Sequence, residues 1–378
     1  MKIAIIVDSL NLSGSGGVGT CVNDLCLGFQ SSSKISNVYL IGIVGTKHED
    51  KLIEELKRNG IQIFCLGAES RKQALTHIVM YAKKLRKVIE ETSKDDFLIC
   101  NLHLKLAVLI GTLATVGLPN IKRVETYHNT YHHYWLQCTV LRPFISKYIC
   151  VSSTAKEEMR KRFHIPEKKL VAIPNGVSRD GLRARVPQDE KTDTSIISIL
   201  TVGRLSYEKN ILTSAKAVAA MKDINFKYRI IGDGPQRNEL LKIIENVENI
   251  EYKGALSREG VLKYLSSSDL VLIPSLWEGR SIFMLEAAAF DKPFIISDCP
   301  GLREPFGEPE LAENEQMRVC RFGYLVKTND AQAYQMAIQH FLDNPNEHIE
   351  MSSHVRMVSE ENDIKNVVKH YIYCFQNN

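Results

Sequence analysis

Strand-like and helix-like runs alternate along the whole chain, and this alternation most narrowly limits what the chain can fold into. Alternating strands and helices form parallel sheets with helical crossovers. The predicted strands of the first half are 2–7, 38–44, 61–66, 97–101, 124–127 and 148–152. The pattern breaks in the polar stretch 175–195 and then restarts. The predicted strands of the second half are 196–202, 226–231, 250–252, 270–274, 293–297 and 323–326.

The break at 175–195 predicts two domains, in agreement with 378 residues at roughly 100–200 residues per domain. We expect an α/β fold of two Rossmann-like, doubly wound domains that face a central cleft. In such domains, ligands bind where the carboxyl ends of the strands meet the following loops. Candidate functional residues are therefore sought directly after the predicted strands.

Composition excludes several classes of protein. Hydrophobic residues make up 44% of the chain and charged residues 24%, which excludes a disordered chain. The longest apolar stretch, 106–118, is interrupted by glycines and threonines and is too short to span a bilayer. The first ten residues are typical of a strand and not of a signal peptide. Nine cysteines without a CxxC pair indicate neither a disulfide framework nor a zinc site, and reduced thiols fit the cytosol.

Charge is divided unevenly along the chain. Residues 1–185 contain 27 Lys and Arg against 16 Asp and Glu, a net charge of +11, whereas the remainder carries −7. A basic first half favours an anionic partner: a phospholipid surface, a diphosphate-bearing acceptor or nucleic acid. Six basic residues on a predicted helix over 71–92, and the aromatic segment 131–136, could meet anionic lipid. Chance segregation of solvated charges is the alternative.

A glycine-rich loop over 14–19 follows the first strand and precedes a helix. It matches G-x-G-x-x-G, in which backbone amides approach a diphosphate at a helix N-terminus. The second predicted strand ends without an acidic residue for a ribose, so the pattern is weak evidence for NAD. A flexible strand–helix loop is the alternative.

In the second half, cations and carboxylates follow the strands. Arg204 and Lys209 come after strand 196–202 and could hold a polyanion. Glu278 follows strand 270–274, and a predicted helix over 282–290 brings Glu286 back on the same side, so both could accept hydrogen bonds from sugar hydroxyls. Gly232 and Asp233 alone indicate only a turn.

Two histidines, His103 and His128, follow first-half strands. With His132 and His133 they could form a metal cluster, but no acidic residue accompanies them. A hydrogen-bonded structural histidine is the alternative for His103.

These residues together resemble the family 4 retaining glycosyltransferases of the GT-B fold, in the branch of bacterial capsule and exopolysaccharide synthesis. The order carries the likeness: Gly16-Gly17, His128, Val151-Ser152, Asn175-Gly176-Val177, Gly203-Arg204, Lys209-Asn210, Gly232-Asp233-Gly234 and Glu278-x7-Glu286. Arg280 and Ser281 depart from the frequent pattern of relatives, in which an apolar residue or Phe is followed by Gly or Pro. The resemblance implies an acceptor-binding domain over 1–185, a nucleotide-sugar-binding domain over 190–360, and a last helix, 361–378, packing back on the first.

The resemblance also implies roles. Arg204 and Lys209 would bind the donor diphosphate, Glu286 the ribose, and Glu278 the donor sugar. His128 would lie beside the reacting sugar, as a catalytic residue with Glu278. The donor-binding set would be Gly16, Gly17, Arg204, Lys209, Gly232, Asp233, Gly279, Arg280, Ser281 and Glu286. No metal or other cofactor is expected.

The expected function is transfer, with retention, of a hexose or N-acetylhexosamine from a nucleotide sugar, with UDP favoured. The acceptor would be a lipid-linked saccharide, met by a cytoplasmic enzyme on the inner face of the cell membrane, and no nucleic acid would take part. An NAD-dependent oxidoreductase is the alternative. A non-catalytic sugar- or nucleic-acid-binding protein of this fold is a third possibility, which the intact Glu278, Glu286, Arg204 and Lys209 disfavour.

Overall fold

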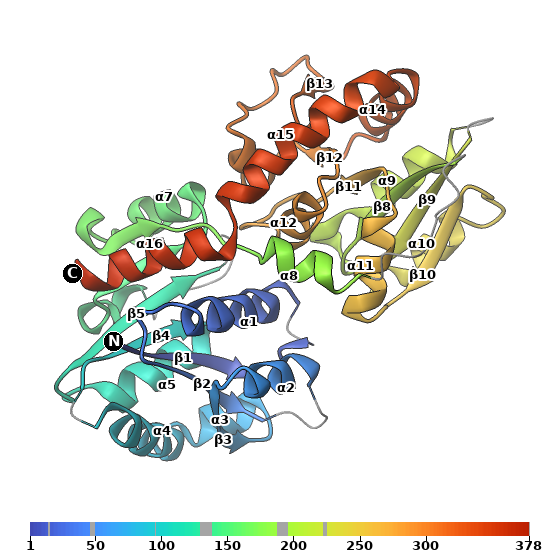
Figure 1. Cartoon of the computed structure of the whole chain (residues 1–378). Coiled ribbons are helices and arrows are strands. Elements are labelled where there is room, and N and C mark those ends of the chain that lie inside the picture. The colour runs from blue at the N-terminus through green and yellow to red at the C-terminus, as the bar shows by residue number, and fades with distance from the viewer. Residues whose placement is uncertain are drawn as a thin grey trace. The chain divides into compact units, whose positions relative to one another are not determined.

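The computed structural model describes residues 1–13, 16–45, 50–94, 96–128, 138–186, 196–221 and 225–377. The chain forms two compact units (Figure 1). The first comprises Met1–Gly176 together with Ile364–Asn378, and the second comprises Val177–Asp363. The chain passes from the first unit to the second at Gly176, near the start of the polar stretch.

A seven-stranded parallel sheet forms the centre of the first unit. Its strands lie in the order β3-β2-β1-β4-β5-β6-β7. Their bounds are β1 (Lys2–Ser9), β2 (Asn37–Val44), β3 (Gln62–Ala68), β4 (Leu98–His103), β5 (Ile121–Tyr127), β6 (Lys147–Cys150) and β7 (Leu170–Ala172). Strand β1 is buried from Ile3 to Asp8, because helices cover both faces of the sheet.

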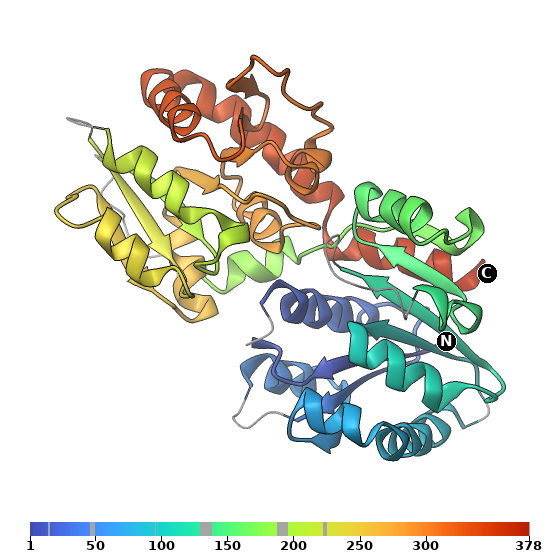
Figure 2. The ribbon, with the colours of Figure 1, turned by 180° about the vertical axis from the view of Figure 1, so that it is seen from behind.

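The helices of the first unit lie on both faces of this sheet, with α1 on one face and α4 and α5 on the other (Figures 1 and 2). Their bounds are α1 (Gly17–Gln30), α2 (Lys51–Arg58), α3 (Arg71–Thr76), α4 (Ile78–Ser93), α5 (Lys105–Thr115), η2 (Arg142–Phe144), α7 (Ser153–Arg162), η3 (Glu167–Lys169) and α16 (Ile364–Gln376).

The single helix predicted over 71–92 is wrong: the structure divides it into α3 and α4 at His77. The Thr76 hydroxyl and the His77 ring both bond the Gln73 carbonyl oxygen, which ends α3 there.

Helix α16 belongs to the first unit although it lies far from it in sequence. Phe29 of α1 packs with its ring centroid 5.8 Å from Tyr371 and 6.0 Å from Phe375. A Cβ on Gly28 would lie 2.7 Å from Val368, so the small residue allows close helix packing. Lys122 of β5 donates a hydrogen bond to the Phe375 carbonyl oxygen at 3.0 Å, which satisfies a helix-end acceptor.

The second unit has a mixed sheet in the order β10-β9-β8-β11-β12-β14-β13. Its strands are β8 (Ile197–Val202), β9 (Phe226–Ile231), β10 (Ile250–Gly254), β11 (Leu270–Ile273), β12 (Phe294–Ser297), β13 (Met317–Cys320) and β14 (Gly323–Val326). Strand β13, which the sequence did not predict, pairs antiparallel with β14 across a tight connection.

The second unit has helices before, between and after its strands in the sequence. They are α8 (Arg179–Ala184), η4 (Tyr207–Lys209), α9 (Ile211–Ala219), α10 (Arg237–Ile243), α11 (Arg258–Ser266), α12 (Ile282–Ala289), α13 (Pro300–Arg303), η5 (Glu304–Phe306), α14 (Ala331–Asp343), η6 (Pro345–Glu347) and α15 (His348–Glu361). Helix α8 precedes the first strand, α14, η6 and α15 follow the last strand, and the other helices lie between strands.

Among the parallel strands of each sheet the order reverses once, between β1 and β4 and between β8 and β11. The doubly wound α/β fold predicted from the alternation is therefore confirmed. The carboxyl ends beside these two points are where such sheets bind ligands.

Candidate active site

The loops after β8 and β9 pack backbone on backbone. Gly203 donates its amide to the Ile231 carbonyl oxygen and Leu205 donates to that of Asp233, both at 3.0 Å. Gly232 has φ 141°, and a Cβ there would lie 1.8 Å from the Gly203 carbonyl oxygen. Only glycine permits this approach, so the turn predicted at Gly232-Asp233 holds the loop that carries Arg204.

Lys209 and Glu278 form an ion pair in the second unit. The Lys209 Nζ lies 2.5 Å from the Glu278 Oε1, and the Ser275 hydroxyl donates to the same oxygen at 2.9 Å. The Leu276 amide donates to the Glu208 carbonyl oxygen at 2.8 Å, which ties the loop after β11 to η4. These contacts bring together Lys209, which is predicted to bind the diphosphate, and Glu278, which is predicted to bind the sugar. The two residues lie 69 positions apart in the sequence.

Arg204 and Asp233 are both exposed at the strand ends. Asp233 accepts a hydrogen bond from the Gly234 amide at 2.8 Å, and Arg237 lies 3.9 Å from its other oxygen. Arg204 therefore lies on the same segment after β8 as Lys209, and the Asp233 carbonyl oxygen anchors this segment through the Leu205 amide.

Glu286 of α12 is buried, and its partner is a residue that the sequence did not single out. The Arg258 Nη2 lies 3.2 Å from the Glu286 Oε1. Burial raises the pKa of the Glu286 carboxyl, and the positive charges of Arg258 and Arg185 lower it. Arg258 follows Ser257, whose hydroxyl caps α11 by accepting from the Gly260 amide. A serine that can cap a helix, directly before Arg258, was the sequence feature that could have drawn attention to this arginine.

The segment Gly279–Ser281 joins Glu278 to α12. Ser281 caps that helix by accepting from the Met284 amide. Arg280 donates from Nη2 to the Asn362 Oδ1 at 2.7 Å, and burial lowers the pKa of its guanidinium to about 10. The backbone beneath is tight, because a Cβ on Gly301 would lie 2.1 Å from the Glu278 carbonyl oxygen.

In the first unit, Gly16 and Gly17 begin α1. Gly16 has φ 58° and provides no side-chain cap to the helix. A Cβ on Gly19 would lie 1.9 Å from the Leu12 carbonyl oxygen, which explains why this position is a glycine. Gly14 and Ser15 lie outside the described residues.

His103 and His128 contact each other at the ends of β4 and β5. The His103 Nδ1 and the His128 Nε2 are 2.8 Å apart, so one nitrogen donates and the other accepts. Burial lowers the pKa of His128 to about 4 and that of His103 well below its usual range, so both rings are neutral near pH 7. His132, His133 and the aromatic segment 131–136 lie outside the described residues.

Asp8, which the sequence analysis did not select, lies near the end of β1. This strand pairs with β4, the strand that ends at His103. The Asp8 Oδ1 accepts from the Ala107 amide at 2.9 Å, and the Arg71 Nε lies 3.4 Å from the Asp8 Oδ2. Burial raises the pKa of this carboxyl, while the Ala107 amide and Arg71 lower it.

The described residues contain no group of three or more metal-ligating side chains and no helix long and apolar enough to cross a bilayer. The nine cysteines are free thiols.

Comparison with known proteins identifies the family. Residues 15–180 match the model of Glycosyltransferase Family 4, and residues 183–357 match the model of Glycosyl transferases group 1. The chain belongs to the family 4 glycosyltransferases. This membership confirms the resemblance and removes the alternative of an NAD-dependent oxidoreductase.

The glycosyltransferase has relatives of similar length. An uncharacterized glycosyltransferase of Methanocaldococcus jannaschii is 24% identical over 331 residues, covering 80% of this chain and 82% of the relative. The UDP-Gal:alpha-D-GlcNAc-diphosphoundecaprenol alpha-1,3-galactosyltransferase of Escherichia coli is 25% identical over 289 residues, covering 69% and 70%. Anabaena Alr3699/HepE, solved in complex with UDP, shares the fold with a TM-score of 0.75 at 14% identity, covering 100% of both chains. The GT-B fold is therefore confirmed.

Proposed function

We propose that this glycosyltransferase moves a hexose or N-acetylhexosamine, with retention, from a UDP-sugar to a lipid-linked saccharide in polysaccharide synthesis. The observation that carries the proposal is the Lys209–Glu278 ion pair at the strand end where Arg204 also lies. The E. coli relative named for a UDP-galactose donor and a diphosphoundecaprenol acceptor supports the same substrate classes. The first unit takes the acceptor and the second takes the donor.

The diphosphate of the donor is assigned to Arg204 and Lys209. A guanidinium can bind phosphate oxygens in pairs, and an ammonium adds a point charge. Lys209 exchanges its carboxylate partner for the phosphate as the donor binds, which leaves Glu278 to accept hydrogen bonds from the sugar hydroxyls. Gly232, Asp233, Gly279, Arg280 and Ser281 shape this site. The charge that develops on the leaving diphosphate is stabilised by these cations without a metal ion.

Glu286 is assigned to the ribose hydroxyls, because an ionised carboxylate accepts from two neighbouring hydroxyl groups. In the first unit, the amides of Gly16 and Gly17 are assigned to the phosphates and His128 is assigned to the reacting sugar. The acceptor hydroxyl attacks from the face that the diphosphate leaves, and its proton passes to a phosphate oxygen. A neutral His128 donates a hydrogen bond to the sugar and takes no proton.

An anionic membrane surface, on the inner face of the cell membrane, is proposed as the place where the acceptor is met. Leu75, Val79 and Met80 of α3 and α4 are 51%, 64% and 41% exposed. Several basic side chains nearby already have partners, since Arg86 lies 3.0 Å from Glu90 and Lys87 lies 4.0 Å from Glu91. Exposed apolar side chains beside lysines are typical of interfacial helices.

Ligand-dependent melting tests the donor assignment. UDP without metal, in EDTA, is expected to stabilise the protein by ~2.7 kcal/mol at a hundredfold excess over Kd, whereas NAD is not. Lys209→Met should remove most of this shift, and Lys216→Met, an exposed lysine on α9, should keep it. A melting temperature that ignores both UDP and GDP in EDTA would rule out the metal-free diphosphate site.

A further inference from the structure

A groove between α1 and α16 lies in the first unit, away from the candidate site. It has a volume of about 580 Å³. Because α1 begins after the carboxyl end of β1 and runs back to the amino end of β2, the Ser31–Lys34 segment at its end lies at the amino edge of the sheet. The candidate site residues lie at the carboxyl edge. The proposed transfer therefore leaves this groove unused.

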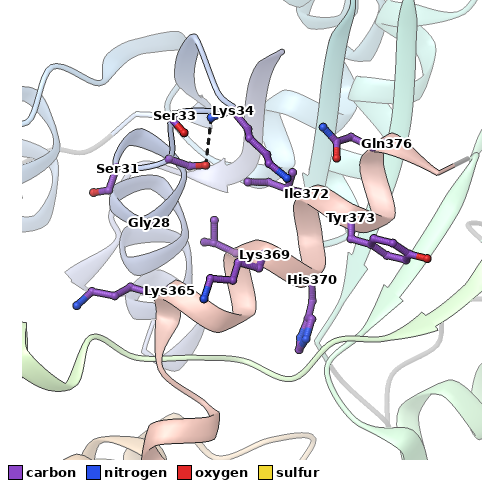
Figure 3. Close-up of a pocket in the computed structure, with 12 residues that line it drawn as sticks. Gly28, Ser31, Ser33, Lys34, Lys365, Lys369, His370, Ile372, Tyr373 and Gln376 are labelled. Carbon is purple, nitrogen blue, oxygen red and sulfur yellow. Dashed lines mark hydrogen bonds between the residues drawn. The ribbon is translucent and has the colours of Figure 1, made fainter.

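The groove has an apolar floor and a basic rim (Figure 3). Val368 and Ile372 are buried at its floor, and Gly28 adds no side chain there. Lys34 extends from the α1 side toward Ile372, and Lys365 and Lys369 project from α16 one helical turn apart (Figure 3). His370 and the residues Ser31, Ser32 and Ser33 complete the polar lining, and of these the Ser31 hydroxyl donates to the Leu27 carbonyl oxygen at 2.9 Å.

Charge decides which ligands fit. Of the described residues, those that line the groove include no aspartate or glutamate, and Ile364–Gln376 has none in its sequence. Three lysines beside the hydroxyl groups of Ser32 and Ser33 attract a phosphate group. Tyr373, which is 70% exposed at the rim, has the apolar body and polar tip of a residue at a lipid–water interface. A free phosphate would use the lysines but not the apolar floor.

We propose that this groove binds the headgroup of an anionic phospholipid together with the first methylenes of its chains. The phosphate lies among Lys34, Lys365 and Lys369, and the methylenes lie on Val368 and Ile372. This binding is a lipid contact distinct from α3 and α4, which lie on the opposite face of the sheet from α1 (Figures 1 and 2). It does not depend on the proposed donor or acceptor.

The test is binding of the full chain to vesicles of phosphatidylcholine with and without phosphatidylglycerol, followed by co-sedimentation. At ~1 kcal/mol per lysine, the variant with Lys34→Gln, Lys365→Gln and Lys369→Gln should lose about 100-fold in partition coefficient. Lys168→Gln, an exposed lysine of the same unit, is the matched control and should bind like the wild type. Lys83→Gln with Lys87→Gln measures the contribution of α4 separately. Tyr373→Ser should weaken binding and leave its salt dependence unchanged, because that side chain carries no charge.

Three results would overturn the proposal: a triple variant that binds like Lys168→Gln, equal binding of the wild type to vesicles without phosphatidylglycerol, or binding abolished by about 10 mM inorganic phosphate at constant ionic strength. The last result would indicate a site for free phosphate. Melting temperature checks that the variants fold. UDP-dependent melting of the same variants separates the two proposals. The triple variant should still be stabilised by UDP. If the proposed donor site is wrong, UDP should fail to stabilise the wild type as well.

Discussion

At the scale of single residues, the candidate site depends on two carboxylates that each have a cationic partner. The Glu278 side chain is 11% exposed, and Lys209 and the Ser275 hydroxyl both bond its Oε1. Glu286 has Arg258. Each carboxylate therefore has a cationic side chain within ion-pair distance.

Replacement of Glu278 tests its role in transfer. Glu278→Gln keeps the size of the side chain but removes the charge that pairs with Lys209. Turnover should fall on the order of 10²–10³ if its hydrogen bonds tighten in the transition state, while UDP still stabilises the protein. Initial rates of donor hydrolysis measure this change, with Glu245→Gln, an exposed acid of the same unit, as control. Normal turnover in the Glu278 variant would remove it from the site.

Arg258 should control the pH dependence of nucleotide binding through Glu286. Burial raises the pKa of Glu286, and loss of Arg258 raises it further, so the carboxyl takes up a proton at a higher pH. Arg258→Met should therefore bind UDP more weakly as the pH falls from about 8 to about 5, starting at a higher pH than in the wild type. Calorimetry across this range measures the shift, and Arg258→Lys should restore part of it. Identical pH profiles in wild type and Arg258→Met would contradict this role.

Glu125 of β5 should make folding stability depend on pH. Burial raises the pKa of this carboxyl to about 8, so it is neutral in the folded chain and ionises in the unfolded chain near its usual pKa. The contribution of Glu125 to stability is then greatest at acidic pH and is lost as the pH rises toward 8, by up to about 1.4 kcal/mol per unit of pKa difference. Glu125→Gln should reduce this fall. Urea unfolding at about pH 5 and pH 8 compares the two proteins, and an equal pH dependence would refute the assignment.

At the scale of elements, short helices hold the site loops by close backbone contact. Helix α13 presses Gly301 against the carbonyl oxygen of Glu278, where a Cβ would come within 2.1 Å. The neighbouring loop after β9 meets Gly203 in the same way at Gly232. The positions of the functional side chains thus depend on glycines that have no functional group of their own.

Gly301→Ala should displace the Glu278 loop. Because the clash is with backbone and not with a flexible side chain, the loop must shift, and the Lys209–Glu278 pair should open. We expect a ten- to hundredfold loss of turnover, about 1–3 kcal/mol, with melting lowered by only a few degrees. Pro300→Ala, one residue earlier in α13, is the control. Unchanged kinetics in Gly301→Ala would show that the loop tolerates the shift.

At the scale of the whole molecule, the chain crosses between its two units twice, after Gly176 and after Asp363. The second crossing delivers α16, whose Val367, Tyr371 and Phe375 are buried in the first unit. The first unit is therefore complete only after the second has been synthesised.

Deletion of residues 364–378 should unfold the first unit and spare the second. It would expose Phe29 and remove a large apolar helix face from the core, at about 1.5–3 kcal/mol for each buried side chain. Limited proteolysis should cut the deleted protein within 1–176 and leave a stable fragment over 177–363. Equal resistance of both units would contradict the assignment of α16 to the first core.

The sequence by itself determined the elements and the strand ends of this protein. The periodicity of strands and helices depends on residues that are close in the sequence. It therefore allowed prediction of both sheets, of α12 and of the loops that carry Arg204, Lys209 and Glu278. Tertiary structure alone decided the pairings, since Lys209 meets Glu278, Arg258 meets Glu286 and His103 meets His128 only through strand register and loop packing. The end of α3 at His77 and the short strands β7 and β13 also escaped prediction, because local side-chain bonds and partner strands specify them. Periodicity reports which face is buried, and it does not report which distant side chain lies opposite.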